Sequence, residues 1–163
     1  MRLLLSLFRL AVASPLLLVA LASCSKDGPK PADPTRMSWT HYGNNKTATS
    51  TDKLVSTTNI AISGAVEAGM VGNSIIKVAV GLTIPQSVGT YQLTATSDAR
   101  AQYIFSGGGG LPGHIYKAES GTLTVTTLTA TNVKGTFDFT GVFVYNGTTD
   151  SETITNGKFD FAL

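Results

Sequence analysis

The stretch IKVAVGLTI, residues 76–84, places an apolar side chain at every second position. In an extended strand, successive side chains point to opposite faces, so every second residue shares one face. A strand with this pattern buries one face and exposes the other, which is typical of antiparallel sheets. The apolar row consists of Ile76, Val78, Val80, Leu82 and Ile84.

The same alternation recurs through the chain from Arg36 onward, in runs rich in threonine and β-branched residues. No apolar stripe with helical spacing accompanies it. The sequence therefore predicts an all-β domain over residues 36–163, built as an antiparallel β-sandwich of about eight to ten strands, with an open or lipocalin-like β-barrel as the alternative. The further apolar rows are Ile60 and Ile62; Tyr91 and Leu93; Ala101, Tyr103 and Phe105; Leu123 and Val125; Phe137 and Phe139; and Phe159, Phe161 and Leu163.

Turn signals separate these runs. Asn146-Gly147 and Asn156-Gly157 are both hairpin candidates, because a type I′ turn needs positive φ at its two central residues. Residues 69–74 form a further polar break. The glycine-rich stretch 106–113 lacks the Lys-Ser/Thr ending and the following helix of a phosphate-binding loop. It is therefore predicted to be a flexible loop.

The first 23 residues have the layout of a secretory signal: Arg2 and Arg9 lie near the start, an apolar stretch follows, and small residues end it. A membrane span needs about 20 apolar residues. The stretch reaches that length only if Arg9 enters the bilayer, with Pro15 further along, and burying the guanidinium is costly. A cleaved signal is therefore favoured over a transmembrane anchor.

Leu21-Ala22-Ser23-Cys24 resembles the lipobox of bacterial lipoproteins, and Cys24 is the only cysteine of the chain. The resemblance implies cleavage between Ser23 and Cys24, a diacylglyceryl group on the thiol and usually an acyl chain, such as palmitate, on the new amino terminus. A single chain binds membranes only marginally, whereas two or three hold a protein there. Residues 24–35, with three prolines among them, are expected to form a lipidated, extended tether.

The charge and the cysteine content exclude a nucleic-acid-binding protein and a disulfide-stabilised domain. The chain has 12 Lys+Arg and 10 Asp+Glu; without Arg2 and Arg9 the mature part from Cys24 carries 10 against 10, a formal charge of zero. No basic patch suited to nucleic acid is left. With one cysteine there is no internal disulfide, so the predicted domain is stabilised by burial alone.

Three stretches together resemble an all-β domain of unknown function found in lipoproteins of Bacteroidota: MSWT at 37–40 followed by the YGN turn at 42–44, GTLTVT at 121–126 leading to VKGTFDF at 133–139, and ITNGKFD at 154–160. The resemblance implies an outer-membrane lipoprotein facing the periplasm or the cell surface. Lys26-Asp27 resembles part of a surface-export signal of these lipoproteins. The family supplies no catalytic residues.

The sequence contains no convincing catalytic motif. No serine lies in a Gly-x-Ser-x-Gly elbow, and the acids are mostly single residues on turns or outward strand positions. His41 and His114, the only histidines, are expected in exposed loops, too few without cysteines for a recognisable zinc site. The sequence predicts no catalytic residues, no metal site and no cofactor.

Trp39, Tyr42 and Tyr116 lie near loop-like segments and are candidate ligand-binding residues, a platform for sugar rings, although the alternation also fits Trp39 in the core. The function expected from the sequence is a lipid-anchored, non-enzymatic binding or interaction module of the cell envelope, with a glycan or an envelope protein as partner. The alternatives are an envelope hydrolase acting on glycan or a related substrate, and a subunit of a surface assembly that uses β-edge addition.

Overall fold

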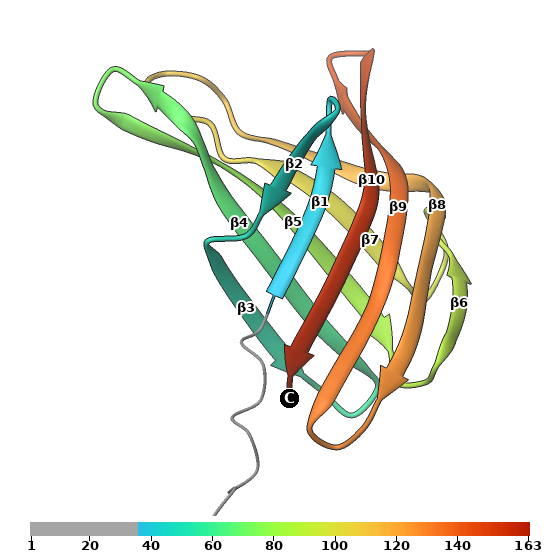
Figure 1. The fold of residues 1–163 in the computed structure, drawn as a ribbon. Coiled ribbons are helices and arrows are strands. Elements are labelled where there is room, and N and C mark those ends of the chain that lie inside the picture. The colour runs from blue at the N-terminus through green and yellow to red at the C-terminus, as the bar shows by residue number, and fades with distance from the viewer. Residues whose placement is uncertain (1–35) are drawn as a thin grey trace, which may run out of the picture. The chain divides into compact units, whose positions relative to one another are not determined.

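The computed structural model describes residues 36–163, and the described part consists of strands and their connections (Figure 1). The predicted signal segment, the lipobox with Cys24 and the tether lie outside the described residues. No helix of residues 36–163 is long and apolar enough to cross a membrane. The strands are β1 (Arg36–His41), β2 (Asn44–Thr47), β3 (Ser50–Val55), β4 (Asn59–Val71), β5 (Ser74–Pro85), β6 (Gly89–Gln92), β7 (Arg100–Phe105), β8 (His114–Leu128), β9 (Asn132–Tyr145) and β10 (Thr148–Ala162).

All ten strands belong to one antiparallel sheet with the order β2-β1-β10-β9-β8-β7-β5-β4-β3. β7 pairs with the first part of β8 and β6 with its later part, so the two short strands share one edge of β8. The predicted all-β antiparallel fold with eight to ten strands is confirmed. Consecutive strands are mostly neighbours, as expected when short turns connect them.

The sheet curls over so that its two ends meet (Figure 1). β2 and β3 lie at opposite ends of the sheet order, yet only Ala48 and Thr49 separate them in the chain. The Ala48 amide donates to the Met37 carbonyl of β1, and the Thr49 amide donates to the Ala65 carbonyl of β4. In the described residues no ladder joins β1 to β4, so the sheet packs on itself like a sandwich without closing into a barrel.

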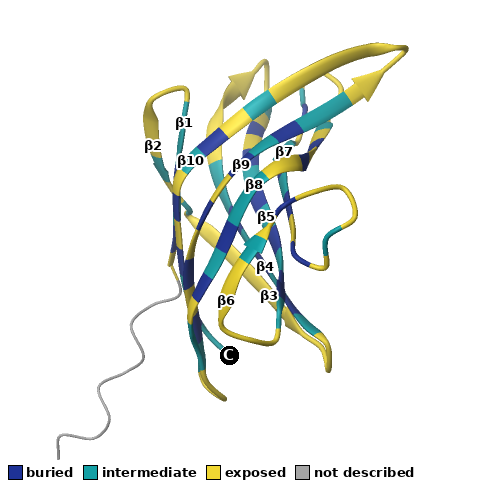
Figure 2. Ribbon diagram, turned by 90° about the vertical axis from the view of Figure 1, so that its right-hand side faces the viewer, coloured by how far each residue is buried: buried dark blue, intermediate teal, exposed yellow. Residues whose placement is uncertain are grey.

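The inner face of the curled sheet is the hydrophobic core. Every residue of the row at 76–84 is buried. Along β8, β9 and β10, buried residues alternate with exposed and half-buried ones (Figure 2). Burying one such aliphatic or aromatic side chain stabilises the fold by about 1.5–3 kcal/mol. The largest fully buried side chains are Trp39, Phe137, Phe159, Phe161, Met37, Ile60, Ile84, Leu93, Leu123, Ile154, Val80 and Val133.

The chain ends inside this core. Phe159 and Phe161 of β10 are 2% and 0% exposed, and Leu163 packs against the same cluster. The Leu163 amide donates to the Thr131 carbonyl, which ties the last residue to the turn before β9. The inward placement predicted for these three side chains is confirmed.

One predicted turn is present and the other is not. Asn146 and Gly147, with φ of 50° and 77°, make the tight turn between β9 and β10, as predicted. Asn156 also has positive φ, 53°, but it lies inside β10, where the pairing with β9 shifts between Ile154 and Gly157. The prediction of a hairpin at Asn156-Gly157 is wrong, because the positive φ serves a β-bulge within a long strand. The stretch 106–113 is the predicted loop, between β7 and β8.

Candidate functional site

Polar side chains gather at one end of the inner face, where β1 ends and β8 and β10 begin. Elsewhere this face is apolar, and within residues 36–163 no charged or amide side chain is fully buried. At this end the sheet borders an open pocket of about 380 Å³, within the size range of small-molecule sites. It is lined by His41, Tyr42, Lys46, Ala68, Val78, Tyr103, Phe105, His114, Tyr116 and Glu152.

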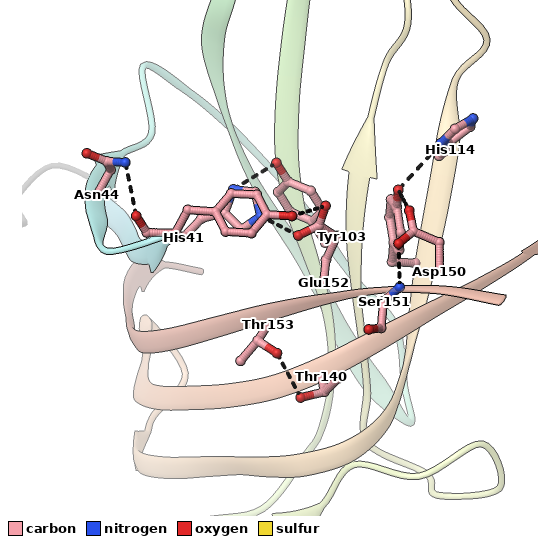
Figure 3. A network of polar contacts seen from close by, with 11 residues as sticks. His41, Asn44, Tyr103, His114, Thr140, Asp150, Ser151, Glu152 and Thr153 are labelled. Carbon is pink, nitrogen blue, oxygen red and sulfur yellow. Dashed lines mark hydrogen bonds and ion pairs between the residues drawn. The ribbon is translucent and has the colours of Figure 1, made fainter.

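Glu152, His41 and Tyr103 form a chain of hydrogen bonds across the pocket (Figure 3). His41 Nε2 lies 2.7 Å from Glu152 Oε2, and the Tyr103 hydroxyl lies 3.3 Å from His41 Nδ1. The side chains of His41 and Glu152 are only 11% and 13% exposed. In the neutral tautomer that satisfies both contacts, Nε2 donates to the carboxylate and Nδ1 accepts from the phenol.

A second chain links Asp150, Tyr116 and His114. The Tyr116 hydroxyl donates to Asp150 Oδ2 over 2.9 Å, and His114 Nδ1 lies 3.4 Å from the same hydroxyl oxygen. The His114 ring stacks on Phe143, with ring centroids 4.4 Å apart and planes 15° from parallel. His114 is thereby held at the start of β8 by one polar and one aromatic contact.

The strand pairing brings the two chains together. Tyr103 of β7 is directly opposite Tyr116 of β8, and their ring centroids are 6.0 Å apart. Asp150 and Glu152 are two residues apart on β10 and therefore face the same side of the sheet. Two tyrosines and two carboxylates thus form one continuous polar and aromatic cluster, of which Tyr103, Tyr116 and Glu152 line the pocket.

Tyr42 covers the edge of this cluster in an unusual backbone conformation. Its φ is 48°, in the two-residue turn between β1 and β2. Positive φ is rare for a bulky residue, and asparagine is the usual choice in such turns. The Tyr42 ring packs on His41 at 4.3 Å between centroids, and its hydroxyl donates to Glu152 Oε1 over 3.0 Å. An outlier of this kind is typical of a position selected for its side chain rather than for the turn.

The surroundings keep the tyrosines protonated. Burial raises the pKa of Tyr103, and the charge of Glu152 raises it further. Burial, followed by the hydrogen bond to Asp150, raises the pKa of Tyr116 to about 12. The pKa of Tyr42, an exposed residue, is raised mainly by its hydrogen bond to Glu152. At neutral pH all three phenols are therefore hydrogen-bond donors, and the carboxylates accept.

The structure places the three ligand-binding candidates, Trp39, Tyr42 and Tyr116, in three different environments. Trp39 is 1% exposed, so it belongs to the core, and its Nε1 has no hydrogen-bond partner among the described residues. Tyr42 and Tyr116 both reach the pocket, one at 76% and the other at 5% exposure. The three side chains do not make a shared exposed platform, because two of them are buried.

The prediction of exposed loop histidines is wrong. His41 ends β1 and His114 begins β8, and both side chains turn toward the pocket. The residues that sequence reasoning missed are Tyr103, Asp150 and Glu152. Asp150 and Glu152 alternate on the same strand face as buried Ile154, and this period-two position was the signal available in the sequence.

A larger groove of about 1010 Å³ lies mainly over the outer face of β4, β5, β7 and β8. Its central row follows the register from Ser63 through Gly81 and Gln102 to Lys117. Small side chains on β4 and β5 flanked by longer ones on β7 and β8 explain the hollow. The smaller inner pocket is the better candidate site, because there the polar groups are oriented by one another.

Within residues 36–163, no group of three or more histidine, cysteine, aspartate or glutamate side chains is placed to hold a metal ion. Comparison with known proteins gave no match: no family model fits the chain, and no curated protein or solved structure is significantly similar to it.

Proposed function

We propose that this protein is a non-enzymatic binding module of the cell envelope, held at the membrane by lipid on Cys24, and that its ligand occupies the pocket between β1, β7, β8 and β10. The observation that carries the proposal is the concentration of oriented polar groups at one end of an otherwise apolar inner face. His41, Tyr103, Tyr116 and Glu152 line a space large enough for a small molecule.

Binding explains the arrangement better than catalysis. A tyrosine nucleophile needs a lowered pKa, whereas burial raises the pKa of Tyr103 and Tyr116. Each carboxylate oxygen of Glu152 already accepts a hydrogen bond from a neighbour, from Tyr42 and from His41. Groups held in this way are preorganised to orient a ligand, at little entropic cost on binding.

The proposed anchor is compatible with an accessible pocket. β1 starts at Arg36, which pairs with Asp160 near the end of β10, whereas the pocket lies beside Asp150 and Glu152 near its start. Ten residues of strand separate Asp150 from Asp160, or about 30 Å. A chain tethered before Arg36 would therefore present the pocket at the end of the domain away from its attachment.

The five tyrosines of the chain make a direct test. Tyr42, Tyr103 and Tyr116 line the pocket, and Tyr91 and Tyr145 do not. The full-length chain, labelled with 3-fluorotyrosine and purified in detergent, gives five ¹⁹F resonances, each assigned by a Tyr→Phe variant. A library of small polar molecules is then screened. Ligands are expected to shift the three pocket resonances and to leave that of Tyr91 unchanged.

The proposal fails if no compound at millimolar concentration shifts the resonances of Tyr42, Tyr103 or Tyr116. It also fails if shifts appear equally at Tyr91, which would indicate nonspecific association. Turnover of any hit compound, followed by chromatography, would contradict the non-enzymatic part alone.

A further inference from the structure

We infer that the ligand is a small organic cation, with its ammonium group facing Glu152, next to Asp150, and its apolar part against the tyrosine rings. This inference rests on the proposed function and adds the chemical class of the ligand. It follows from the hydrogen-bonding capacity that the pocket leaves unused, from its charge and from its aromatic walls.

The three phenol donors of the pocket are already engaged. Tyr42 donates to Glu152, Tyr116 donates to Asp150, and the hydrogen bond between Tyr103 and His41 uses the phenol in the tautomer described above. A carboxylate offers about four lone-pair sites, so Glu152 and Asp150 retain accepting capacity. A ligand that satisfies these carboxylates brings donors. An ammonium group has three donors and no acceptor.

The charge around the pocket also favours a cationic ligand. Within the described residues, neither Glu152 nor Asp150 pairs with a lysine or an arginine; Glu152 contacts only His41 as a basic partner. Lys46 on β2 lines the pocket, and among residues 36–163 it forms no ion pair there. Glu152 lines the pocket and Asp150 lies beside it, bonded to the lining residue Tyr116, so two carboxylates lie near one lysine. With neutral histidines this region is net negative and repels anions.

The aromatic walls supply the second contact that an organic cation uses. Tyr103 and Tyr116 line the pocket with ring centroids 6.0 Å apart, Phe105 adds a further ring to the lining, and Tyr42 adds a ring at the opening. A cation near the face of an aromatic ring is attracted by the quadrupole of the ring, more strongly where water is excluded. The methylene groups of the ligand gain burial against the same rings.

The test compares two probes of the same shape, 2-phenylethylamine and its uncharged analogue 2-phenylethanol, titrated into the full-length protein in detergent by isothermal calorimetry. We expect the amine to bind about tenfold or more tightly than the alcohol, since one charge-assisted hydrogen bond supplies that factor. Raising the salt concentration to about 0.5 M is expected to weaken the amine alone. The ¹⁹F resonances of Tyr103 and Tyr116 report whether either probe occupies the pocket.

Matched variants identify the groups responsible. Glu152→Gln and Asp150→Asn each keep the shape and remove one charge. The first is expected to reduce amine affinity about tenfold, and the second severalfold, because Asp150 lies beside the pocket and acts through its charge. Glu119→Gln makes the same chemical change at an exposed position of β8 and is expected to leave affinity unchanged. Lys46→Met removes the competing ammonium and is expected to strengthen amine binding severalfold.

The outcomes separate the two proposals. Equal affinity for amine and alcohol in the pocket, or binding of neutral molecules with no amine binding, overturns the cation inference and leaves the binding module standing. Amine binding that survives both carboxylate substitutions also overturns it, provided that Trp39 fluorescence shows the variants to be folded. If neither the amine nor any library compound shifts a pocket resonance, both proposals fail together.

Discussion

Phe159 of β10 lies directly opposite Gly135 of β9, and its ring occupies the space that a side chain at residue 135 would need. An ideal Cβ on Gly135 would lie 2.5 Å from Phe159 Cζ and 2.0 Å from the Thr124 carbonyl oxygen. The neighbouring pair repeats the arrangement in reverse, because Gly157 of β10 faces Phe137 of β9. Two glycines thus let two phenylalanines pack at the centre of the core.

Gly135→Ala is therefore expected to destabilise the protein strongly. The nearest obstacle is the backbone oxygen of Thr124, which cannot rotate away as the end of a side chain can. Overpacking of this kind costs about 1–3 kcal/mol, and we expect a loss in the upper part of that range. The measurement is urea unfolding followed by the fluorescence of Trp39, the only tryptophan of the chain, which is 1% exposed in the folded state.

Gly81→Ala is the matched control. Gly81 lies on the opposite face of the sheet, and the nearest atoms to a Cβ there would be those of the flexible Gln102 side chain, at 3.2 Å or more. Replacing a strand glycine with alanine reduces the entropy lost on folding, so stability should be unchanged or rise by about 0.5–1 kcal/mol. Equal destabilisation by the two substitutions would contradict the packing described for Phe159.

The motif around these glycines shows what the sequence can and cannot predict. Alternation places Phe137, Phe139, Phe159 and Phe161 on the inner face because strand geometry alone decides it. Asn156-Gly157 was mispredicted because a type I′ turn and a β-bulge both need positive φ at this asparagine. The two are told apart only by the strand pairing, in which Gly157 lies opposite Phe137, 20 residues away in the chain.

The candidate site depends on contacts between residues that are even further apart in the chain. Glu152 meets His41 only because β10 pairs with β1, across a separation of 111 residues. No local pattern indicates that pairing. In the sequence, Tyr103 and Tyr116 look like ordinary members of apolar rows. Their hydroxyl groups find hydrogen-bond partners only because the curled sheet brings the end of β1 and the start of β10 close to them.

The buried tyrosines predict a loss of stability at alkaline pH. The pKa of Tyr116 is about 12 in the folded protein against the ordinary 10.0. The folded state therefore retains this proton at a pH where the unfolded state releases it. The resulting stability is fully present below about pH 10 and is lost as pH rises toward 12 and beyond. Tyr103, with its raised pKa, acts in the same direction.

Tyr116→Phe isolates the contribution of one phenol. Its free energy of unfolding is expected to fall by about 1 kcal/mol at pH 7, because the hydrogen bond to Asp150 is lost. Between pH 9 and 11.5 its stability should decline less steeply than that of the unsubstituted protein. Urea unfolding at several pH values measures both effects. Tyr145→Phe, at a 66% exposed position, is the control, and a slope equal to that control would refute the assignment.

The backbone of Tyr42 predicts a conflict between stability and binding. Tyr42→Asn places the preferred residue at a φ of 48° and should raise the free energy of unfolding by up to about 1 kcal/mol, reduced by the loss of the exposed contact with Glu152. The same substitution removes one wall of the pocket, so affinity for the pocket ligand should fall. Thermal unfolding of the variant tests the expected rise in stability, and calorimetric titration of the same sample tests the expected fall in affinity. A variant that is both less stable and equally able to bind would show that Tyr42 serves the turn alone.

Cys24 decides whether the domain is attached to a membrane in the proposed way. In a bacterial host, the unsubstituted chain is expected to incorporate radiolabelled palmitate, to be cut before Cys24 and to sediment with membranes, because two or three acyl chains hold a protein there. Cys24→Ala should accumulate as unlabelled precursor, and globomycin should block cleavage of the unsubstituted chain. Ser23→Gly keeps a small residue before the cysteine and should be processed normally. Palmitate labelling that persists in Cys24→Ala, or unlabelled mature protein from the unsubstituted gene, would remove the lipid anchor from the proposed function while leaving the pocket and its ligand to be tested on their own.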